Sequence, residues 1–247
     1  MNLPRISLLL TFFISGCFTA KQPSTTTKNT FTFEYSQKES ATLGSAKMLI
    51  AFIRPYYAED FSSKSSELFT AFKKAIGNDI EELIISKGFS LKGPYESFDE
   101  MIFDDKKNTQ ILINIEISPR FTAHEGSWKS HLNLLSPQNS TYSYIGKVSL
   151  VGKININGVE PLTNEKIWSK SVSIPNVENI QIETSERYSR VLNDLELIKD
   201  PGVYNALGKA LMTQYAGILD KISTHFSVAE FQSLKDQIKE LKSKKGY

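Results

Sequence analysis

Cys17 is the only cysteine in this 247-residue chain, and it closes an N-terminal segment with the pattern of an export signal. Arg5 supplies the basic start, residues 6–14 form a short and mostly apolar run, and Ser15 and Gly16 are the small residues before the cleavage point. The run is too short to cross a bilayer, which takes about 20 apolar residues. With no second cysteine, an exported chain has no disulfide to stabilise it, so the fold must depend on a buried hydrophobic core.

Residues 14–17 read Ile-Ser-Gly-Cys and fit a bacterial lipobox, in which an aliphatic residue and two small residues precede the cysteine. We therefore predict a signal peptide over residues 1–16, cleaved before Cys17, and acyl chains such as palmitate on the Cys17 thiol. The alternative is an ordinary signal peptide whose cleavage region contains a cysteine by chance. Two or three acyl chains give lasting attachment, because each buried CH₂ contributes about 0.8 kcal/mol. The predicted membrane contact is therefore lipid-anchored and needs no transmembrane helix.

The composition is that of an ordinary globular domain. Hydrophobic residues make up 40% of the chain, and the formal net charge is +2. A nearly neutral balance gives no general attraction to nucleic acid, so we expect no nucleic-acid partner. The length is sufficient for one domain with a sizeable core.

Apolar patterning predicts a series of strands after a polar tether. Residues 17–29 are predicted to be the lipidated cysteine and a flexible tether, because they are rich in Thr, Ser, Gln and Lys. Residues 30–35 alternate polar and aromatic side chains, which predicts a strand. Residues 48–53 are continuously apolar, which is typical of a strand covered on both faces. Further strands are predicted over residues 89–91, 110–117, 142–157 and 166–174.

Apolar residues at three- and four-residue spacing predict two long helices, over residues 62–87 and 203–226. A short helix is predicted over residues 97–105, and a third, amphipathic helix begins at Ser227 with lysines on its outer side. The pattern over residues 176–199 is ambiguous.

These elements predict a single α+β domain over residues 30–247 with a C-terminal helical extension. We expect a mostly antiparallel sheet packed against two long helices, with a C-terminal amphipathic helix, because this arrangement buries the apolar stripe of every element.

Motifs that carry catalysis are missing from the sequence. It contains no Gly-x-Ser-x-Gly elbow, no His-Glu-x-x-His motif and no glycine-rich phosphate loop. His124 and His131 fall in one predicted loop, but a catalytic zinc usually takes three protein ligands and no third one is evident. We therefore expect a protein that is not an enzyme and that has neither a cofactor nor a metal site.

The predicted irregular loop over residues 119–140 is the best candidate for a binding surface. Arg120 can bind a carboxylate in a fork geometry, and the ring of Trp128 can stack on the apolar face of a sugar. Sialic acid carries both of these groups, so Arg120 and Trp128 are the candidate ligand-binding residues. The alternative is an ordinary loop whose Trp128 packs on the body of the domain.

Several segments resemble a known family. They are the lipobox, residues 31–35 (FTFEY), residues 46–55 (AKMLIAFIRP), residues 72–89 and residues 231–242 (FQSLKDQIKELK). In these segments the chain is similar to the neuraminyllactose-binding haemagglutinin lipoproteins of Helicobacter, also described as flagellar-sheath adhesins. The resemblance covers most of the mature chain, is weakest in its middle, and looks like that of a paralogue.

The resemblance implies a non-enzymatic, lipid-anchored lipoprotein of the cell surface, at the outer membrane or the flagellar sheath, with adhesion to a sialylated glycan as its function. The family's sialyllactose motif is rich in Lys and Arg and falls after the predicted strand that ends near Ile117. Here residues 118–126 read SPRFTAHEG, with one arginine and no lysine, so that motif does not carry over. The alternative is a structural or accessory envelope lipoprotein that binds a protein partner and has no glycan site.

Overall fold

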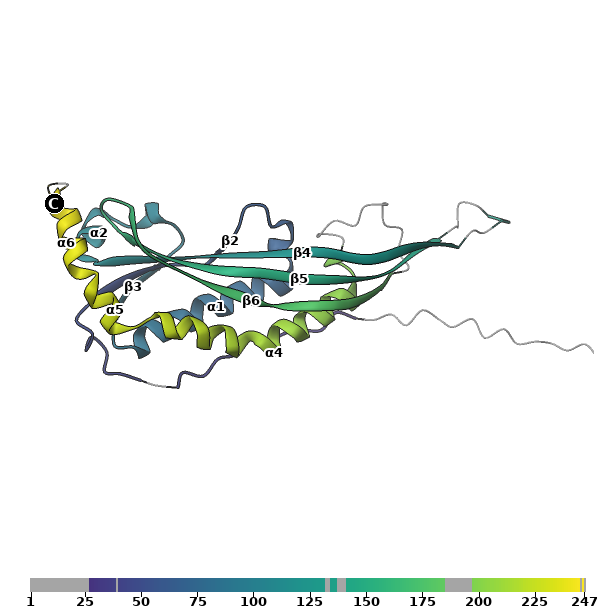
Figure 1. Ribbon diagram of the computed structural model, residues 1–247, viewed down its shortest axis with the longest axis horizontal. Helices are drawn as coiled ribbons and strands as arrows, with labels where there is room; N and C mark the ends of the chain where they lie inside the picture. The colour runs from purple at the N-terminus through teal and green to yellow at the C-terminus, as the bar shows by residue number, and fades with distance from the viewer. Residues whose placement is uncertain are drawn as a thin grey trace, which may run out of the picture.

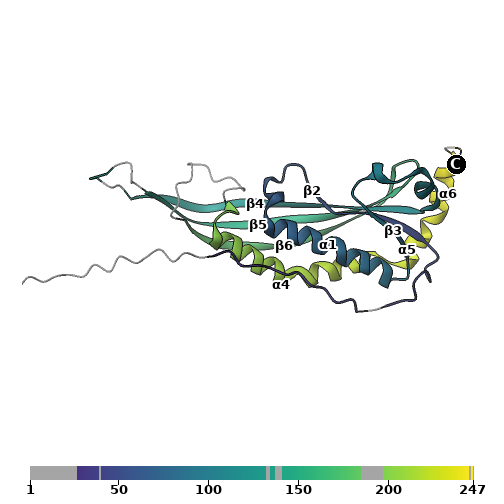
Figure 2. The ribbon, with the colours of Figure 1, turned by 180° about the vertical axis from the view of Figure 1, so that it is seen from behind.

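The computed structural model describes residues 27–38, 40–131, 134–136, 141–184, 197–244 and 246. Cys17, the predicted signal peptide and the first part of the predicted tether lie outside these residues. In the described residues a long sheet carries the two longest helices on one of its faces (Figures 1 and 2).

The sheet has six strands in the order β3-β1-β4-β5-β6, with β2 paired to β4 outside this path. Their bounds are β1 Leu49–Ile53, β2 Tyr56–Tyr57, β3 Ser90–Tyr95, β4 Ile111–His131, β5 Thr141–Glu160 and β6 Glu165–Thr184. β1 runs parallel to β3 and to β4, whereas β4, β5 and β6 form an antiparallel meander of strands 20 or 21 residues long. The predicted α+β class and the mostly antiparallel sheet are confirmed.

The helices are α1 Glu67–Ser86, α2 Phe103–Asn108, α4 Pro201–His225, α5 Val228–Ser233 and α6 Lys235–Lys244, with short 3-10 turns η1 Ser62–Ser65 and η2 Phe98–Glu100. We expected two long helices against the sheet; among the described residues three helices, α1, α4 and α6, have seven or more residues. The helix predicted from Ser227 is divided at Leu234 into α5 and α6. No helix in the described part of the chain is long and apolar enough to span a membrane.

Local sequence determines where the two longest helices begin. Ser66 caps α1, because its hydroxyl accepts a hydrogen bond from the backbone N–H of Phe69 at 3.4 Å. Asp200 caps α4: its Oδ1 accepts hydrogen bonds from the N–H groups of Gly202 (2.8 Å) and Val203 (3.1 Å). These bonds satisfy backbone donors that have no partner within the helix.

One hydrophobic core lies between the sheet and the helices α1 and α4 (Figure 2). The apolar stripe of each helix meets the inward-facing residues of β1, β4, β5 and β6, which alternate along the strands. The core is rich in aromatic rings, and its largest fully buried ones are Phe52, Phe61, Phe69, Phe72, Phe89, Phe226, Phe231 and Tyr215.

The opposite face of the sheet is polar along much of its length. Asn155 donates a hydrogen bond to Glu116 at 3.1 Å and accepts one from Ser171 at 3.0 Å. This is the alternation expected of an antiparallel sheet with one packed and one solvated face. Under η2 and α2 this face carries a small second cluster, made of Ala51, Ile53, Met101, Leu112 and Val159.

The strand predicted over residues 30–35 is wrong. Residues 27–38, called the strap here, run alongside α4 and α1 and pair with none of the described strands. Phe33 is buried, with its ring centroid 5.3 Å from that of Phe72 and 5.3 Å from that of Tyr215. The alternation of polar and aromatic residues predicts that one side of the segment is buried. In the strap that side packs on helices, so its backbone has no neighbouring strand with which to form a β-ladder.

The irregular loop predicted over residues 119–140 is also wrong in its first half, because β4 continues to His131. Pro119 lacks a backbone N–H and is therefore unusual inside a paired strand. In the structure it stands opposite Gly152, where a Cβ would lie only 2.9 Å from the Cα of Pro119 and 2.8 Å from the carbonyl oxygen of Ser118. Gly152 therefore makes room for proline inside the meander.

The outer halves of β4, β5 and β6 project beyond the helices (Figure 1). The β4–β5 register shifts between Ala123 and Gly126, where a bulge places one extra residue on β4. β6 continues to Thr184, so the first part of the ambiguous segment 176–199 is strand.

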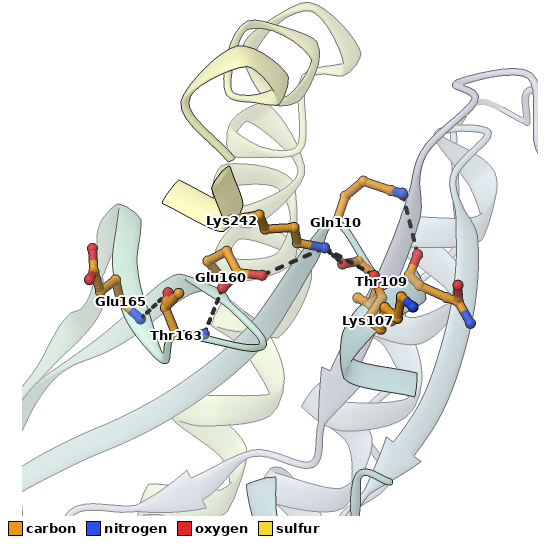
Figure 3. Close-up of polar contacts among 8 residues, drawn as sticks. Lys107, Thr109, Gln110, Glu160, Thr163, Glu165 and Lys242 are labelled. Carbon is orange, nitrogen blue, oxygen red and sulfur yellow. Dashed lines mark hydrogen bonds and ion pairs between the residues drawn. The ribbon is translucent and has the colours of Figure 1, made fainter. Parts of the chain in front are cut away.

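At the opposite end of the sheet, α6 is held by Lys242 (Figure 3). The Nζ of Lys242 donates hydrogen bonds to the backbone carbonyls of Lys107 (3.0 Å) and Thr109 (3.1 Å). It also lies 3.6 Å from Oε1 of Glu160, a fully buried carboxylate at the end of β5. One lysine thus joins the C-terminal helix to the ends of β4 and β5.

Candidate functional site

The two residues predicted to bind a ligand do not form one site. Arg120 lies on the solvated face of β4, and its Nη2 is 4.0 Å from Oδ2 of Asp60; both side chains are about three-quarters exposed, 74% and 77%. Trp128 is also on β4, opposite Tyr144 in the β4–β5 register. Eight residues of extended strand separate Arg120 from Trp128, a distance of about 26 Å. One small sugar therefore cannot contact both.

The two loop histidines, His124 and His131, are likewise strand residues of β4. Among the residues that the structure describes, no group of three or more His, Cys, Asp or Glu side chains could hold a metal ion. Cys17, the predicted lipidation site, is outside the described residues.

A hollow among the described residues lies where the strap crosses the C-terminal ends of α1 and α4. We call it the strap cleft. Its two adjoining parts have volumes of about 260 Å³ and 360 Å³. Both parts are lined by Gln37, Lys38 and Ser86. The first part is completed by Tyr35, Lys87, Asp220, Ser223 and Thr224, and the second by Ser40, Glu82 and Ile85.

Asp220 is the polar centre of the strap cleft. The Nζ of Lys38 donates hydrogen bonds to Oδ1 (2.8 Å) and Oδ2 (2.7 Å), and the hydroxyl of Tyr35 donates to Oδ1 at 2.9 Å. The bond from Lys38 and then that from Tyr35 lower the pKa of Asp220, so the carboxylate is ionised at neutral pH. Burial and the bond to Asp220 raise the pKa of Tyr35 to about 12, so Tyr35 keeps its proton and remains a donor.

A second polar pair lies behind the strap, between α1 and α4. The hydroxyl of Tyr215 donates a hydrogen bond to Oδ2 of Asp79. The side-chain amide of Gln37 donates to the backbone carbonyl of Asp79 at 3.2 Å. Burial is the largest influence on Asp79 and raises its pKa, while the Tyr215 hydrogen bond opposes this rise. These bonds join the strap to both long helices and fix the position of the cleft.

The strap cleft is chemically suited to a small polar ligand. Lys38 and Asp220 are 70% and 41% exposed, so a ligand in the cleft can reach a donor and a carboxylate acceptor side by side. The volumes fall near the lower end of the range of about 300–1,000 Å³ that is typical of ligand pockets. A single sugar ring has this size and offers hydroxyl groups that both donate and accept.

No sequence pattern marks this cleft. Its central ion pair joins residues 182 positions apart, and each partner taken alone is an ordinary charged residue of a strap or of a helix surface. Only the packing of the strap on α4 brings Lys38 and Asp220 together.

A second exposed feature lies near α6 and not near the strap cleft. Ile102 and Phe103, at the start of α2, are 63% and 57% exposed. Adjacent exposed apolar side chains are more typical of a protein-binding surface than of a sugar site. In Figure 1 they belong to the end of the molecule that carries α2 and α6.

No protein-family model matches the chain, and no curated protein matches it. Among solved structures, a neuraminyllactose-binding hemagglutinin homolog from Helicobacter pylori matches with a TM-score of 0.55 and 14% identity, over 85% of this chain and 98% of that chain. A lipoprotein from Neisseria meningitidis (TM-score 0.30, 13% identity, 69% of this chain and 99% of that chain) also matches. So does a protein from Xanthomonas campestris (TM-score 0.36, 8% identity, 83% and 95%). The likeness to the Helicobacter structure shows a shared fold.

Proposed function

We propose that this chain is a lipid-anchored lipoprotein of the bacterial cell surface, at the outer membrane or the flagellar sheath. We propose further that it acts as an adhesin that binds a sialylated glycan in the strap cleft and catalyses no reaction. The observation that carries the proposal is the path of the strap. Its first residues, Thr27 and Asn29, hydrogen-bond to Asn205 near the start of α4, only ten positions after Cys17, and its last residues line the cleft.

Two further points support the proposal. In this proposal the acylated Cys17 precedes the strap by ten positions, so the membrane anchor is at the end of the domain where α4 begins. The fold is shared with a structure named as a hemagglutinin homolog over 98% of that structure's length. The strap cleft then lies at the other end of α4, away from the anchor, where a ligand outside the cell can reach it.

Titration with sialyllactose, followed by ligand-observed NMR with lactose as the control ligand, tests the glycan part. We expect saturable binding of sialyllactose that weakens by about tenfold or more in Lys38→Ala, because a lost hydrogen bond to a charged group costs about 1.5–3 kcal/mol. Arg120→Ala and Trp128→Ala are the control variants, since both residues lie outside the cleft. If Arg120→Ala abolished sialyllactose binding and Lys38→Ala left it unchanged, the binding site would lie on β4 and not in the strap cleft. No binding at millimolar sialyllactose would contradict a glycan function.

Incorporation of labelled palmitate tests the anchor. We expect the wild-type protein to incorporate palmitate and to float with lipid vesicles, and Cys17→Ser to do neither. Palmitate incorporation in Cys17→Ser would show that the lipobox is not the modified site.

A structural or accessory lipoprotein that binds a protein partner is the second candidate function, and the exposed pair Ile102 and Phe103 favours it. Crosslinking in intact cells from a photoreactive group at position 103 tests this candidate. A specific envelope protein that is captured here, together with no sialyllactose binding, would favour the second function over the first.

A further inference from the structure

The two most exposed large hydrophobic side chains among the described residues lie at the tip of the β4–β5 hairpin. Leu134 is 88% exposed and Leu135 is 97% exposed. They are adjacent, they follow β4 and precede β5 in the chain, and they belong to neither hydrophobic cluster of the described residues. Figure 1 shows β4 and β5 projecting beyond the helices. Adjacent and strongly exposed apolar side chains at a projecting tip are typical of an interaction surface.

The sequence around the tip identifies the kind of partner. Residues 126–146 contain no Asp and no Glu, although the chain has 27 acidic residues. The same span carries Trp128, Tyr142 and Tyr144, and the register places Trp128 opposite Tyr144 and Ser130 opposite Tyr142. Trp and Tyr are enriched at the headgroup level of membranes, and carboxylates are costly there. The segment therefore has leucines at its tip, Trp and Tyr further back along both strands, and no acidic residue. Such a segment is suited to contact with a lipid surface.

The position of the tip relative to the anchor supports the same partner. The strap begins beside Asn205, near the start of α4, and the hairpin projects past this end of α4, away from α6 (Figures 1 and 2). From Phe121, the last core residue of β4, to His131 at its end, ten residues of strand extend about 33 Å. From Cys17 to Thr27, ten residues of chain reach at most about 36 Å. Ten residues of chain are therefore long enough to reach as far from this end of the domain as the hairpin projects.

We propose that the tip of the β4–β5 hairpin, centred on Leu134 and Leu135, inserts into the membrane leaflet that holds the acyl chains of Cys17. This inference rests on the proposed lipid anchor. The two leucines enter the acyl region, and the span with Trp128, Tyr142 and Tyr144 lies at the headgroups. Attachment at two points, unlike a flexible tether alone, gives the domain one orientation, with the strap cleft directed away from the membrane.

The single cysteine makes a direct test possible. Because Cys17 is acylated in the mature protein, a cysteine introduced elsewhere is the only free thiol and can be labelled uniquely. Leu135→Cys is labelled with a polarity-sensitive fluorophore in the full, lipidated protein, which is then reconstituted into phosphatidylcholine–phosphatidylglycerol vesicles. Leu43→Cys is the matched control, since Leu43 is another exposed leucine (65%) and lies beside the C-terminal end of α1.

We expect the Leu135→Cys label to shift to the blue and to be quenched by nitroxide-bearing lipids several times more strongly than the Leu43→Cys label. Adding Leu134→Asp to Leu135→Cys should reduce the quenching to the control level, because a carboxylate is expelled from the acyl region. Equal quenching at both positions in protein that floats with the vesicles would overturn the inference and leave the anchor intact.

Two other outcomes also decide the matter. Protein that does not float has lost the anchor, which overturns the proposed lipid attachment and this inference with it. A Leu135→Cys thiol that is protected from a membrane-impermeant maleimide in cells, but is not quenched by lipid in vesicles, would identify a protein as the partner of the tip and overturn a membrane contact.

Discussion

Gly208 and Gly217 both lie on α4, but only Gly208 allows a close approach. A Cβ at Gly208 would overlap the ring of Phe31, whereas a Cβ at Gly217 would meet nothing within 4 Å. Phe31 belongs to the strap, so Gly208 is the point at which α4 lets the strap dock. Glycine in a helix interior is otherwise less stable than alanine by about 0.8–1.0 kcal/mol.

We expect Gly217→Ala to raise the free energy of unfolding by about 0.5–1 kcal/mol, since its methyl group enters open space. Gly208→Ala has the same gain in helix propensity but displaces Phe31, and we expect a net loss of about 1–2 kcal/mol from overpacking. Urea unfolding followed by circular dichroism measures both variants. A Gly208→Ala protein as stable as Gly217→Ala would show that Phe31 does not pack on α4.

Asp79 makes the stability of the protein depend on pH. Burial, the largest cause, raises its pKa above the usual 3.8, although the hydrogen bond from Tyr215 lowers it in part. A carboxyl group whose pKa is raised in the folded state contributes fully below its unfolded pKa, and this contribution is lost as the pH rises through the folded-state pKa. At neutral pH the ionised Asp79 therefore opposes folding.

We expect Asp79→Asn to be at least as stable as the wild type at pH 7, because its amide oxygen still accepts the hydrogen bond from Tyr215 while the half-buried charge is gone. The difference should shrink as the pH falls, because the wild-type carboxyl then becomes protonated and neutral. Tyr215→Phe, the companion variant, removes the donor and should cost about 1–2 kcal/mol at pH 7. Urea unfolding midpoints over a pH series measure the stability of both variants. If Asp79→Asn lost stability relative to the wild type as the pH rises, the ionised Asp79 would stabilise the fold and not oppose it.

Among the elements, α6 packs on the core through Ile238 and also carries one half of a buried ion pair. Glu160 is fully buried, and its Oε2 accepts a hydrogen bond from the N–H of Thr163 at 2.7 Å. Its Oε1 faces the Nζ of Lys242 at 3.6 Å. Lys244 is on the same helix, but its ion pair with Glu240 is exposed, at 67% and 65%. The two lysines therefore allow a buried and an exposed ion pair to be compared on one element.

We expect Lys242→Met to lower the free energy of unfolding by about 3–5 kcal/mol, because it leaves a buried carboxylate without its cation. Lys244→Met should cost about 0.5 kcal/mol or less. Adding Glu160→Gln to Lys242→Met should recover most of the loss, since the remaining buried group is then neutral. Urea unfolding and hydrogen exchange of the α6 amides are the measurements. Equal effects of the two lysine variants would show that Lys242 and Glu160 are not paired in solution.

The molecule as a whole is elongated, because three strands run past the helices that cover them (Figure 1). The inner part of each strand is buried against α1 and α4, and the outer part of the meander is held by strand pairing. The strap cleft and the hairpin tip consequently lie toward opposite ends of the molecule (Figure 2).

We expect the radius of gyration measured by small-angle X-ray scattering to exceed the value of about 18 Å for a compact domain of this length. Replacing residues 124–147 by a two-residue Asn-Gly turn joins Ala123 to Val148, which stand opposite each other in the register. This variant keeps the tether and should have a smaller radius of gyration. An unchanged value would mean that the hairpin folds back onto the body in solution.

Much of the fold was predictable because its signals are local. The apolar stripes of α1 and α4 and the apolar run of β1 depend on residues within one or two turns of each other, and their elements lie close to the predicted ranges. The α+β class follows from the order of these elements. The candidate binding residues Arg120 and Trp128 were predicted from their residue types within one expected loop, whereas the structure places them eight residues apart on one strand.

The sequence by itself determined the lipobox motif, the amphipathic helices and the class of the fold, because each depends on residues that are close together in the chain. Only the tertiary structure decided that residues 30–35 pack on helices, that β4 passes through Pro119 and that Lys38 meets Asp220. In each case the deciding partner is distant in the chain: Phe72 and Tyr215 for Phe33, Gly152 for Pro119, and Asp220 for Lys38. Periodicity reports that a side chain will be buried, but the identity of the surface that buries it depends on how the whole chain packs.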